Sequence, residues 1–212
     1  MGSTAAIVVA AGGGARFGAP KQFAELDGTR LVDRAVAVAD TACDAVVLVL
    51  PAGRAWDGAP VHAVVAGGPT RADSARAGLA AVPDDADVVV VHDAARPLAT
   101  KALFAAVVAA VRDGADAAVP GVALADTVKR VADDRVLGTV PREELVAVQT
   151  PQAFRRDALR DAHADGGDAT DDAALVEAAG GMVVVVPGEP ANLKVTTTRD
   201  LAVATALLAE GR

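Results

Sequence analysis

The sequence predicts an α/β fold, in which a mostly parallel sheet is flanked by helices and a β-arm protrudes from it. Short apolar runs rich in Val and Ala alternate with segments of helical periodicity, and strands that alternate with helices form parallel sheets through right-handed crossovers. Hydrophobic residues make up 52% of the 212 residues but aromatic residues only 2%, which suits a core of small and β-branched side chains. The alternation breaks between residues 120 and 149.

Each expected element follows from a local signal. Asp27-Gly28 indicates a turn, and Thr70 with Asp73 resembles a capping box at the start of a helix. The expected strands are 5–11, 45–50, 61–65, 87–92 and 182–186, and the expected helices are 31–42, 70–82, 100–112, 157–164, 171–179 and 200–210. Ligands are expected at the carboxyl ends of the parallel strands.

The segment 120–149 alternates short apolar runs with charged residues and has no helical period before Arg142. This pattern predicts a β-hairpin arm outside the main sheet. The sequence contains no internal repeat and no low-complexity linker, so we expect residues 1–212 to form a single domain with this arm.

Composition excludes several classes of function. The formal net charge is -8, which argues against nonspecific binding to nucleic acids or anionic membranes, and the few aromatics argue against base stacking. Cys43 is the only cysteine, so no intrachain disulfide forms, and we expect a buried structural thiol on a helix. No run is long and apolar enough to span a bilayer, and the start lacks a basic region followed by a hydrophobic segment. The expected compartment is the cytoplasm.

A Gly-rich loop follows the first expected strand, where residues 8–22 read VVAAGGGARFGAPKQ. A dinucleotide-binding fingerprint would need a third glycine where Phe17 stands, and an acid at the end of the second strand. A P-loop would need Lys and a hydroxyl residue where Ala19 and Pro20 stand. The loop fits neither of these two motifs. It does offer glycine backbone N–H groups with Arg16 and Lys21 beside them, and this arrangement suits a polyphosphate.

Other motifs make this loop specific. They are VHDAARP at 91–97, ADTVK at 125–129, QTPQAF at 149–154, TDD at 170–172 and NLKVTT at 192–197. With the Gly-rich loop and Gly67-Gly68, this set resembles the 2-C-methyl-D-erythritol 4-phosphate cytidylyltransferase family over nearly the whole chain. The resemblance implies a Rossmann-like fold, a homodimer, CTP and a small phosphorylated sugar alcohol as substrates, Mg²⁺ as cofactor, and a role in non-mevalonate isoprenoid synthesis.

Two alternatives stay open. The ribitol 5-phosphate cytidylyltransferases are similar in layout, although Ala94-Ala95 between Asp93 and Arg96 is more similar to the methylerythritol enzymes. A non-catalytic nucleotide-binding protein on the same fold is the other alternative, and the presence of both the cations and the acid argues against it. Pro69 follows Gly67-Gly68 directly. Because proline has no backbone N–H, this position cannot donate a backbone hydrogen bond to a ligand.

The resemblance also implies roles for individual residues. The nucleotide would be lined by Ala10, Ala11, Gly12, Gly14, Gly68 and Ser74, with Ser74 near the cytosine ring. Arg16 and Lys21 would hold its phosphates, and Lys194 would reach the α-phosphate. The chain has only four lysines, at 21, 101, 129 and 194, and two of them fall on this proposed clamp.

Asp93 would bind Mg²⁺, because hard carboxylate oxygens suit that ion. The acceptor would be held by residues from several motifs, namely Arg96, Thr127, Arg142, Thr150 and Thr170. Thr127 and Arg142 lie on the arm, which in the family inserts into the partner subunit, so the arm would act in trans. We interpret His92 as structural, since this chemistry needs no imidazole base, and His62 and His163 lack metal-ligand spacing.

Overall fold

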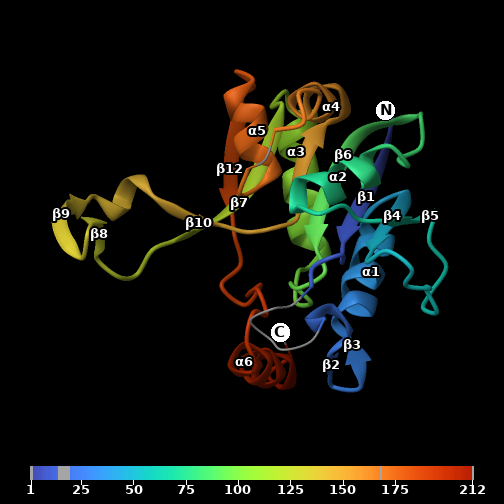
Figure 1. The fold of residues 1–212 in the computed structure, drawn as a ribbon, viewed down its shortest axis with the longest axis horizontal. Coiled ribbons are helices and arrows are strands. Elements are labelled where there is room, and N and C mark those ends of the chain that lie inside the picture. Colours follow the sequence, from blue (N-terminus) through green and yellow to red (C-terminus); the bar gives the residue numbers. More distant parts are fainter. Residues whose placement is uncertain (1, 14–19, 168, 212) are drawn as a thin grey trace.

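The computed structural model describes residues 2–13, 20–167 and 169–211. Its body is a mostly parallel sheet with helices on both faces, from which a thin arm extends to one side (Figure 1). The fold class predicted from the sequence is therefore confirmed.

The first half of the chain builds four parallel strands in a doubly wound order. Its strands are β1 (Ser3–Val9), β4 (Ala45–Leu50), β5 (Ala63–Ala66) and β6 (Ala86–Asp93), and its helices are α1 (Leu31–Ala42), α2 (Arg71–Leu79) and α3 (Lys101–Arg112). β1 lies between β4 and β6, and β5 pairs with the far side of β4. The chain therefore reverses its direction of winding between β1 and β6, which is where open α/β sheets form ligand sites.

The second half extends the sheet with strands of both directions. It contains β7 (Ala117–Ala123), β10 (Val146–Val148), β11 (Gln152–Arg155), α4 (Arg156–Ala162), α5 (Asp172–Ala178), β12 (Val183–Pro187) and α6 (Thr198–Ala209). β11 runs antiparallel between β6 and β7, while β12 pairs parallel with β7. The sequence did not predict β11, because four residues are too few to show a strand period.

Two apolar layers hold the helices to the sheet. On one face, side chains of α1 and α3 pack against β1, β4 and β6, with Phe104 fully buried among them. On the other face, α4 and α5 pack on the sheet through Leu159 and Val176. A third cluster joins α6 to the hairpin of β2 (Glu25–Leu26) and β3 (Thr29–Arg30), which turns at Asp27-Gly28 as predicted.

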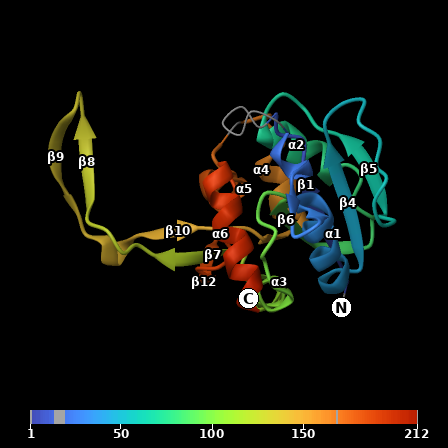
Figure 2. The same cartoon turned by 90° about the horizontal axis from the view of Figure 1, so that it is seen from below.

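The predicted arm is present as a hairpin that stands away from the body (Figure 2). Its strands, β8 (Val128–Ala132) and β9 (Arg135–Val140), pair only with each other. The predicted bounds were too wide, because residues 120–123 and 146–148 pair in the main sheet as the end of β7 and as β10. A short 3-10 helix, Arg142–Glu144, leads from the arm back to β10.

Most of the other predicted elements agree with the structure to within a few residues, and α1 and β4 have the predicted bounds. Helix α2 ends at Leu79, three residues earlier than predicted, while its capping box at Thr70 and Asp73 is confirmed. Cys43 follows α1 as its C-cap residue and is half-buried, and burial raises the pKa of its thiol to about 12. Among the described helices, none has the length and apolar character needed to cross a membrane.

Gly78 allows α2 to approach the sheet closely. A Cβ added at this position would lie 2.4 Å from Cγ2 of Ile7 and 3.0 Å from Cγ2 of Val49, both of which are fully buried. We therefore expect Gly78→Ala to lower the free energy of unfolding by about 1–3 kcal/mol, because overpacking outweighs the helix propensity of alanine. Urea denaturation measures this change.

Gly138→Ala is the control for that measurement. The position lies on β9 with nothing within 4 Å of an added Cβ, so its effect should stay within about 0.5 kcal/mol. A stabilised Gly78→Ala variant would show that α2 can move away from the sheet at no cost.

Candidate active site

A cavity of about 410 Å³ opens at the carboxyl ends of β1 and β6. Its walls come from the loop after β1, the start of α2, the end of β6 and the segment before α6. This is the topological switch point of the sheet, so the cavity lies where the sequence predicted a ligand.

Most of the residues predicted to bind the nucleotide line this cavity. They are Ala10, Ala11, Gly12, Lys21, Gly68, Ser74, Asp93 and Lys194. Gly14 and Arg16 lie outside the described residues. The sequence motifs therefore converge in space, although they are spread over some 180 positions of the chain.

The two glycines before α2 are required by close packing. A Cβ on Gly67 would lie 2.3 Å from the Cβ of Ala11, and one on Gly68 would lie 2.3 Å from the Cβ of Asp73. Ser74 is buried, and its hydroxyl donates to the backbone carbonyl of Thr70 at 3.0 Å. This packing places the start of α2 directly against the Gly-rich loop.

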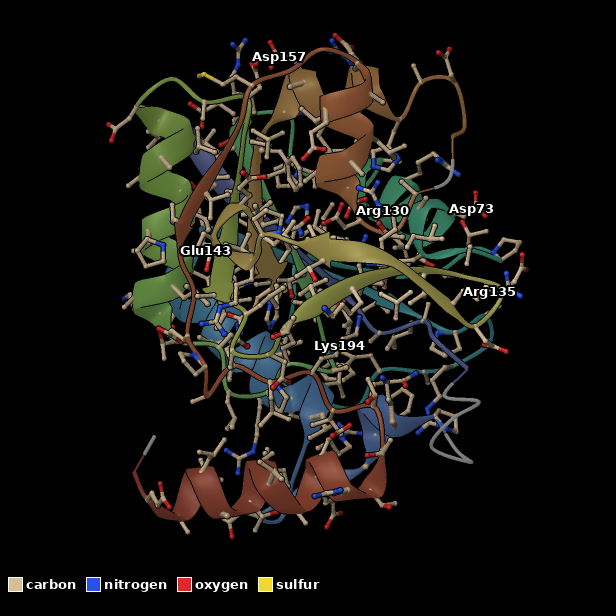
Figure 3. All side chains as sticks on the ribbon, turned by 90° about the vertical axis from the view of Figure 1, so that its left-hand side faces the viewer. Asp73, Arg130, Arg135, Glu143, Asp157 and Lys194 are labelled. Atoms are coloured by element: carbon tan, nitrogen blue, oxygen red, sulfur yellow. The ribbon has the colours of Figure 1, made fainter. Side chains whose placement is uncertain are left out.

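The centre of the site is the buried carboxylate of Asp93, which lies between two cations. Its Oδ1 accepts from Nε of Arg71 at 3.2 Å, and its Oδ2 accepts from Nζ of Lys194 at 2.6 Å. Burial would raise the pKa of Asp93, but the charges of Arg71 and Lys194 outweigh it and hold that pKa well below its usual value. Asp93 is therefore ionised at neutral pH. Lys194 lies between the sheet and α6 (Figure 3).

Arg71 belongs to a longer buried chain of charges. Its Nη1 donates to Oδ2 of Asp172 at 2.7 Å, and Oδ1 of Asp172 lies 3.1 Å from Nε2 of His163. Asp172 has only 1% of its side chain exposed. Burial would raise the pKa of Asp172, whereas the hydrogen bond to His163 and the charge of Arg71 together lower it. Sequence reasoning missed Arg71. The available signal was its position, because it is the first residue of the helix that follows Gly67-Gly68.

Thr150 and His92 support the backbone around Asp93. The hydroxyl of Thr150 accepts from the backbone N–H of Asp93 at 3.0 Å and lies 3.1 Å from Nδ1 of His92. The other ring nitrogen of His92 lies 3.2 Å from the carbonyl oxygen of Arg96. Burial lowers the pKa of His92 to about 4, so the ring is neutral at pH 7.

Arg96 lies behind the cavity rather than on its wall. Its Nη1 donates to the carbonyl oxygen of Asn192 at 2.8 Å and its Nη2 to that of Val148 at 3.3 Å. Within the part of the chain that the structure describes, its buried Nε has no partner. Burial lowers the pKa of Arg96 and the charge of Asp93 only partly offsets this. The guanidinium therefore ties the segment before α6 to β10.

The remaining residues predicted to bind the acceptor are not on the cavity wall. Thr127 and Arg142 lie on the arm, where Arg142 donates to the carbonyl of Ala125 and is about half exposed. Thr170 is exposed and precedes Asp171, the N-cap residue of α5. One chain therefore assembles the predicted nucleotide half of the site, while it leaves these three acceptor residues apart from it.

Mg²⁺ fits the donors that the site offers. No group of three or more acidic, His or Cys side chains capable of holding a metal occurs among the described residues. Mg²⁺ commonly binds one or two carboxylates and takes its other ligands from water and substrate phosphates. The ionised carboxylate of Asp93 at the cavity wall would be such a single protein ligand.

A Gly-rich loop and convergent cations at the switch point of a Rossmann-like sheet define a nucleotide-binding α/β enzyme. The model of the 2-C-methyl-D-erythritol 4-phosphate cytidylyltransferase family matches residues 4–210. The chain belongs to this family and is therefore a nucleotidyltransferase.

Individual relatives agree with this assignment. The chain is 49% identical to the 2-C-methyl-D-erythritol 4-phosphate cytidylyltransferase of Frankia casuarinae, over 97% of this chain and 81% of that one. It is 47% identical to the enzyme of the same name from Rhodococcus jostii, over 99% of this chain and 97% of that one. The crystal structure of the Thermus thermophilus enzyme superimposes with a TM-score of 0.84 at 34% identity, over 96% of this chain and 98% of that one.

Lys194 provides the first test of this site. We expect Lys194→Ala to lower kcat by about 10²- to 10³-fold, because one electrostatic stabiliser of the transition state is lost. Lys101→Ala is the matched control, since Lys101 is exposed at the start of α3 and should leave kcat within about twofold. Steady-state kinetics on folded protein measure both. A Lys194→Ala variant that turned over within about threefold of the parent would contradict the assignment.

Proposed function

We propose that this chain couples CTP to 2-C-methyl-D-erythritol 4-phosphate, forming 4-diphosphocytidyl-2-C-methyl-D-erythritol and pyrophosphate in non-mevalonate isoprenoid synthesis. The observation that carries the proposal is the convergence of the Gly-rich loop, Lys21, Lys194 and Asp93 on one cavity. Family membership supports the methylerythritol acceptor over ribitol 5-phosphate. We propose the cytoplasm as the compartment, in keeping with the single cysteine.

The reaction is an in-line displacement at the α-phosphorus of CTP. An oxygen of the acceptor phosphate forms a bond to that phosphorus, while the bond from the phosphorus to the bridging oxygen breaks and pyrophosphate leaves. Because both reactants are anions, the protein must offset their repulsion and stabilise charge on the equatorial oxygens. Lys21 and Lys194 line the cavity and would supply that charge, together with Arg16.

Asp93 and Lys194 would exchange partners when the nucleotide binds. In the free chain they neutralise each other at 2.6 Å, and the side chain of Lys194 is 39% exposed. Mg²⁺, when bound beside Asp93, would neutralise triphosphate oxygens and polarise the α-phosphorus. Lys194 would then turn to the α-phosphate, while Arg71 keeps its hold on Asp93 because it is anchored by the buried Asp172.

The acceptor half of the site would come from a second copy of the chain. Thr127 and Arg142 are carried on an arm that stands off from the body, and three apolar side chains on the arm (Val131, Val136 and Leu137) are 61–63% exposed. Exposed apolar side chains on a hairpin are typical of a surface that a partner covers. A homodimer whose arms reach each other's cavities would bury them and complete both sites.

A substrate panel tests the proposed reaction. We expect pyrophosphate release from CTP with 2-C-methyl-D-erythritol 4-phosphate and Mg²⁺, much slower release with ribitol 5-phosphate, and none in excess chelator. The physical reason for the last result is that uncompensated triphosphate charge repels the acceptor. A coupled pyrophosphate assay measures all three. Faster turnover of ribitol 5-phosphate would contradict the acceptor, and full activity in chelator would contradict the metal.

Mixed dimers test whether the arm acts in trans. Lys194→Ala and Arg142→Ala should each be inactive alone. If each site combines one body with the partner's arm, a mixed dimer has one site with both lesions and one with neither. After random mixing, half of the dimers are mixed and half of their sites are intact, so about a quarter of the parental activity should return.

Mixing Lys194→Ala with Lys21→Ala is the matched control, because both lesions lie on the body and no intact site forms. Activity is measured after co-refolding, and subunit exchange is verified by mass spectrometry of tagged chains. If exchange occurs and no activity returns in the Lys194→Ala with Arg142→Ala mixture, then the arm serves its own subunit.

A further inference from the structure

Gln22 is a buried polar residue of the cavity lining to which neither the motifs nor the reaction gives a role. It lies in the short 3-10 helix η1 (Lys21–Phe23), and only 3% of it is exposed. Its Nε2 donates to the carbonyl oxygen of Ala10 at 2.7 Å and to that of Gly12 at 3.0 Å. Because both partners are acceptors, the amide of Gln22 has to face them with its NH₂ group and not with its oxygen.

These two hydrogen bonds fix alternate peptide units at the start of the Gly-rich loop. A trans peptide is planar, so its N–H points opposite to its C=O. When the carbonyls of Ala10 and Gly12 turn toward Gln22, the N–H groups of Ala11 and Gly13 turn away from it. Both of those residues line the cavity, and an added Cβ on Gly13 would meet nothing within 4 Å.

The other contacts of this segment also favour a fixed conformation. The N–H of Ala10 donates to the carbonyl of Val49 at 2.8 Å, so the peptide before the loop is tied to β4. Gln22 then holds the carbonyls of Ala10 and Gly12, which would repel a phosphate if they faced it. Backbone N–H groups directed at one space form an anion site, and its strength depends on their being oriented before the ligand arrives.

We infer that Gln22 is a positioning residue that orients the start of the Gly-rich loop, residues 10–13, for the phosphates of CTP. This inference rests on the proposed function, in which that loop binds the triphosphate. The same anchor holds η1, so it also places Lys21, the adjacent residue, at the cavity wall. Gln22 acts through the backbone of its neighbours, because its Nε2 is bound to the carbonyls of Ala10 and Gly12.

Gln22→Met tests the inference, because methionine has a similar length and no donor. Pyrophosphate and cytidine serve as separate probes of the two halves of the nucleotide, with Mg²⁺ present. We expect the Kd of pyrophosphate to rise by about 10- to 100-fold, since hydrogen bonds to a charged ligand are lost. The Kd of cytidine should stay within about threefold. Calorimetry measures the first and ligand-observed NMR the second.

Two further variants separate positioning from loss of stability. Gln22→Glu fills the same volume, and its buried carboxyl, when protonated, donates one hydrogen bond in place of two, so it should have an intermediate Kd for pyrophosphate. It also remains as a test if the methionine variant does not fold. Leu159→Ala is the stability control, because Leu159 is buried in α4, which packs on β6, β11 and α5. It should lower the Tm without changing the Kd of pyrophosphate.

Equal weakening of both probes, or no weakening of either, in folded Gln22 variants would overturn the inference and leave the proposed function intact. If the parent protein itself fails to bind pyrophosphate, then the phosphate role of the loop is wrong, and the inference falls with it.

Discussion

The site depends on one buried carboxylate that is shared by two cations. Asp93 ends the strand β6, Arg71 begins α2 and Lys194 lies in the segment before α6, so this contact joins three distant parts of the chain. A buried charge is tolerated only when it is paired, and loss of one partner leaves an uncompensated charge in a low-dielectric environment. The requirement to pair Asp93 therefore fixes the walls of the cavity relative to one another.

The same pairing explains how an acidic chain can bind polyanions. Arg71 and Lys194 are both held by the carboxylate of Asp93 in the free protein, which limits their mutual repulsion before a nucleotide arrives. The two partners of Asp93 differ, because Arg71 is also tied to the buried Asp172 whereas Lys194 has no second acid in the structure described. This asymmetry leaves one fixed cation and one that can move to a phosphate.

Backbone orientation matters as much as charge in the nucleotide half. Gly67 and Gly68 are glycines because neighbouring side chains occupy the space of a Cβ, while the carbonyls of Ala10 and Gly12 are turned by the amide of Gln22. The acceptor half has a different origin, since Thr127 and Arg142 are carried away from the body on the arm. In the proposed homodimer, the anion cradle of one chain would be completed by these residues of the other.

By itself the sequence determined the α/β class, the bounds of α1 and β4, the capping box of α2, the arm and eight of the residues that line the cavity, because each leaves a local pattern or a motif. Local patterns could not reveal β11, which is too short to show a period and is held by its neighbours on both sides. Arg71, Asp172 and Gln22 were missed for a related reason. Their importance arises from partners that are up to 101 positions away, or from carbonyls that carry no side-chain signal. Only the tertiary structure decided these contacts, because burial removes water as the competing partner and makes each polar group depend on the few atoms that packing brings within reach.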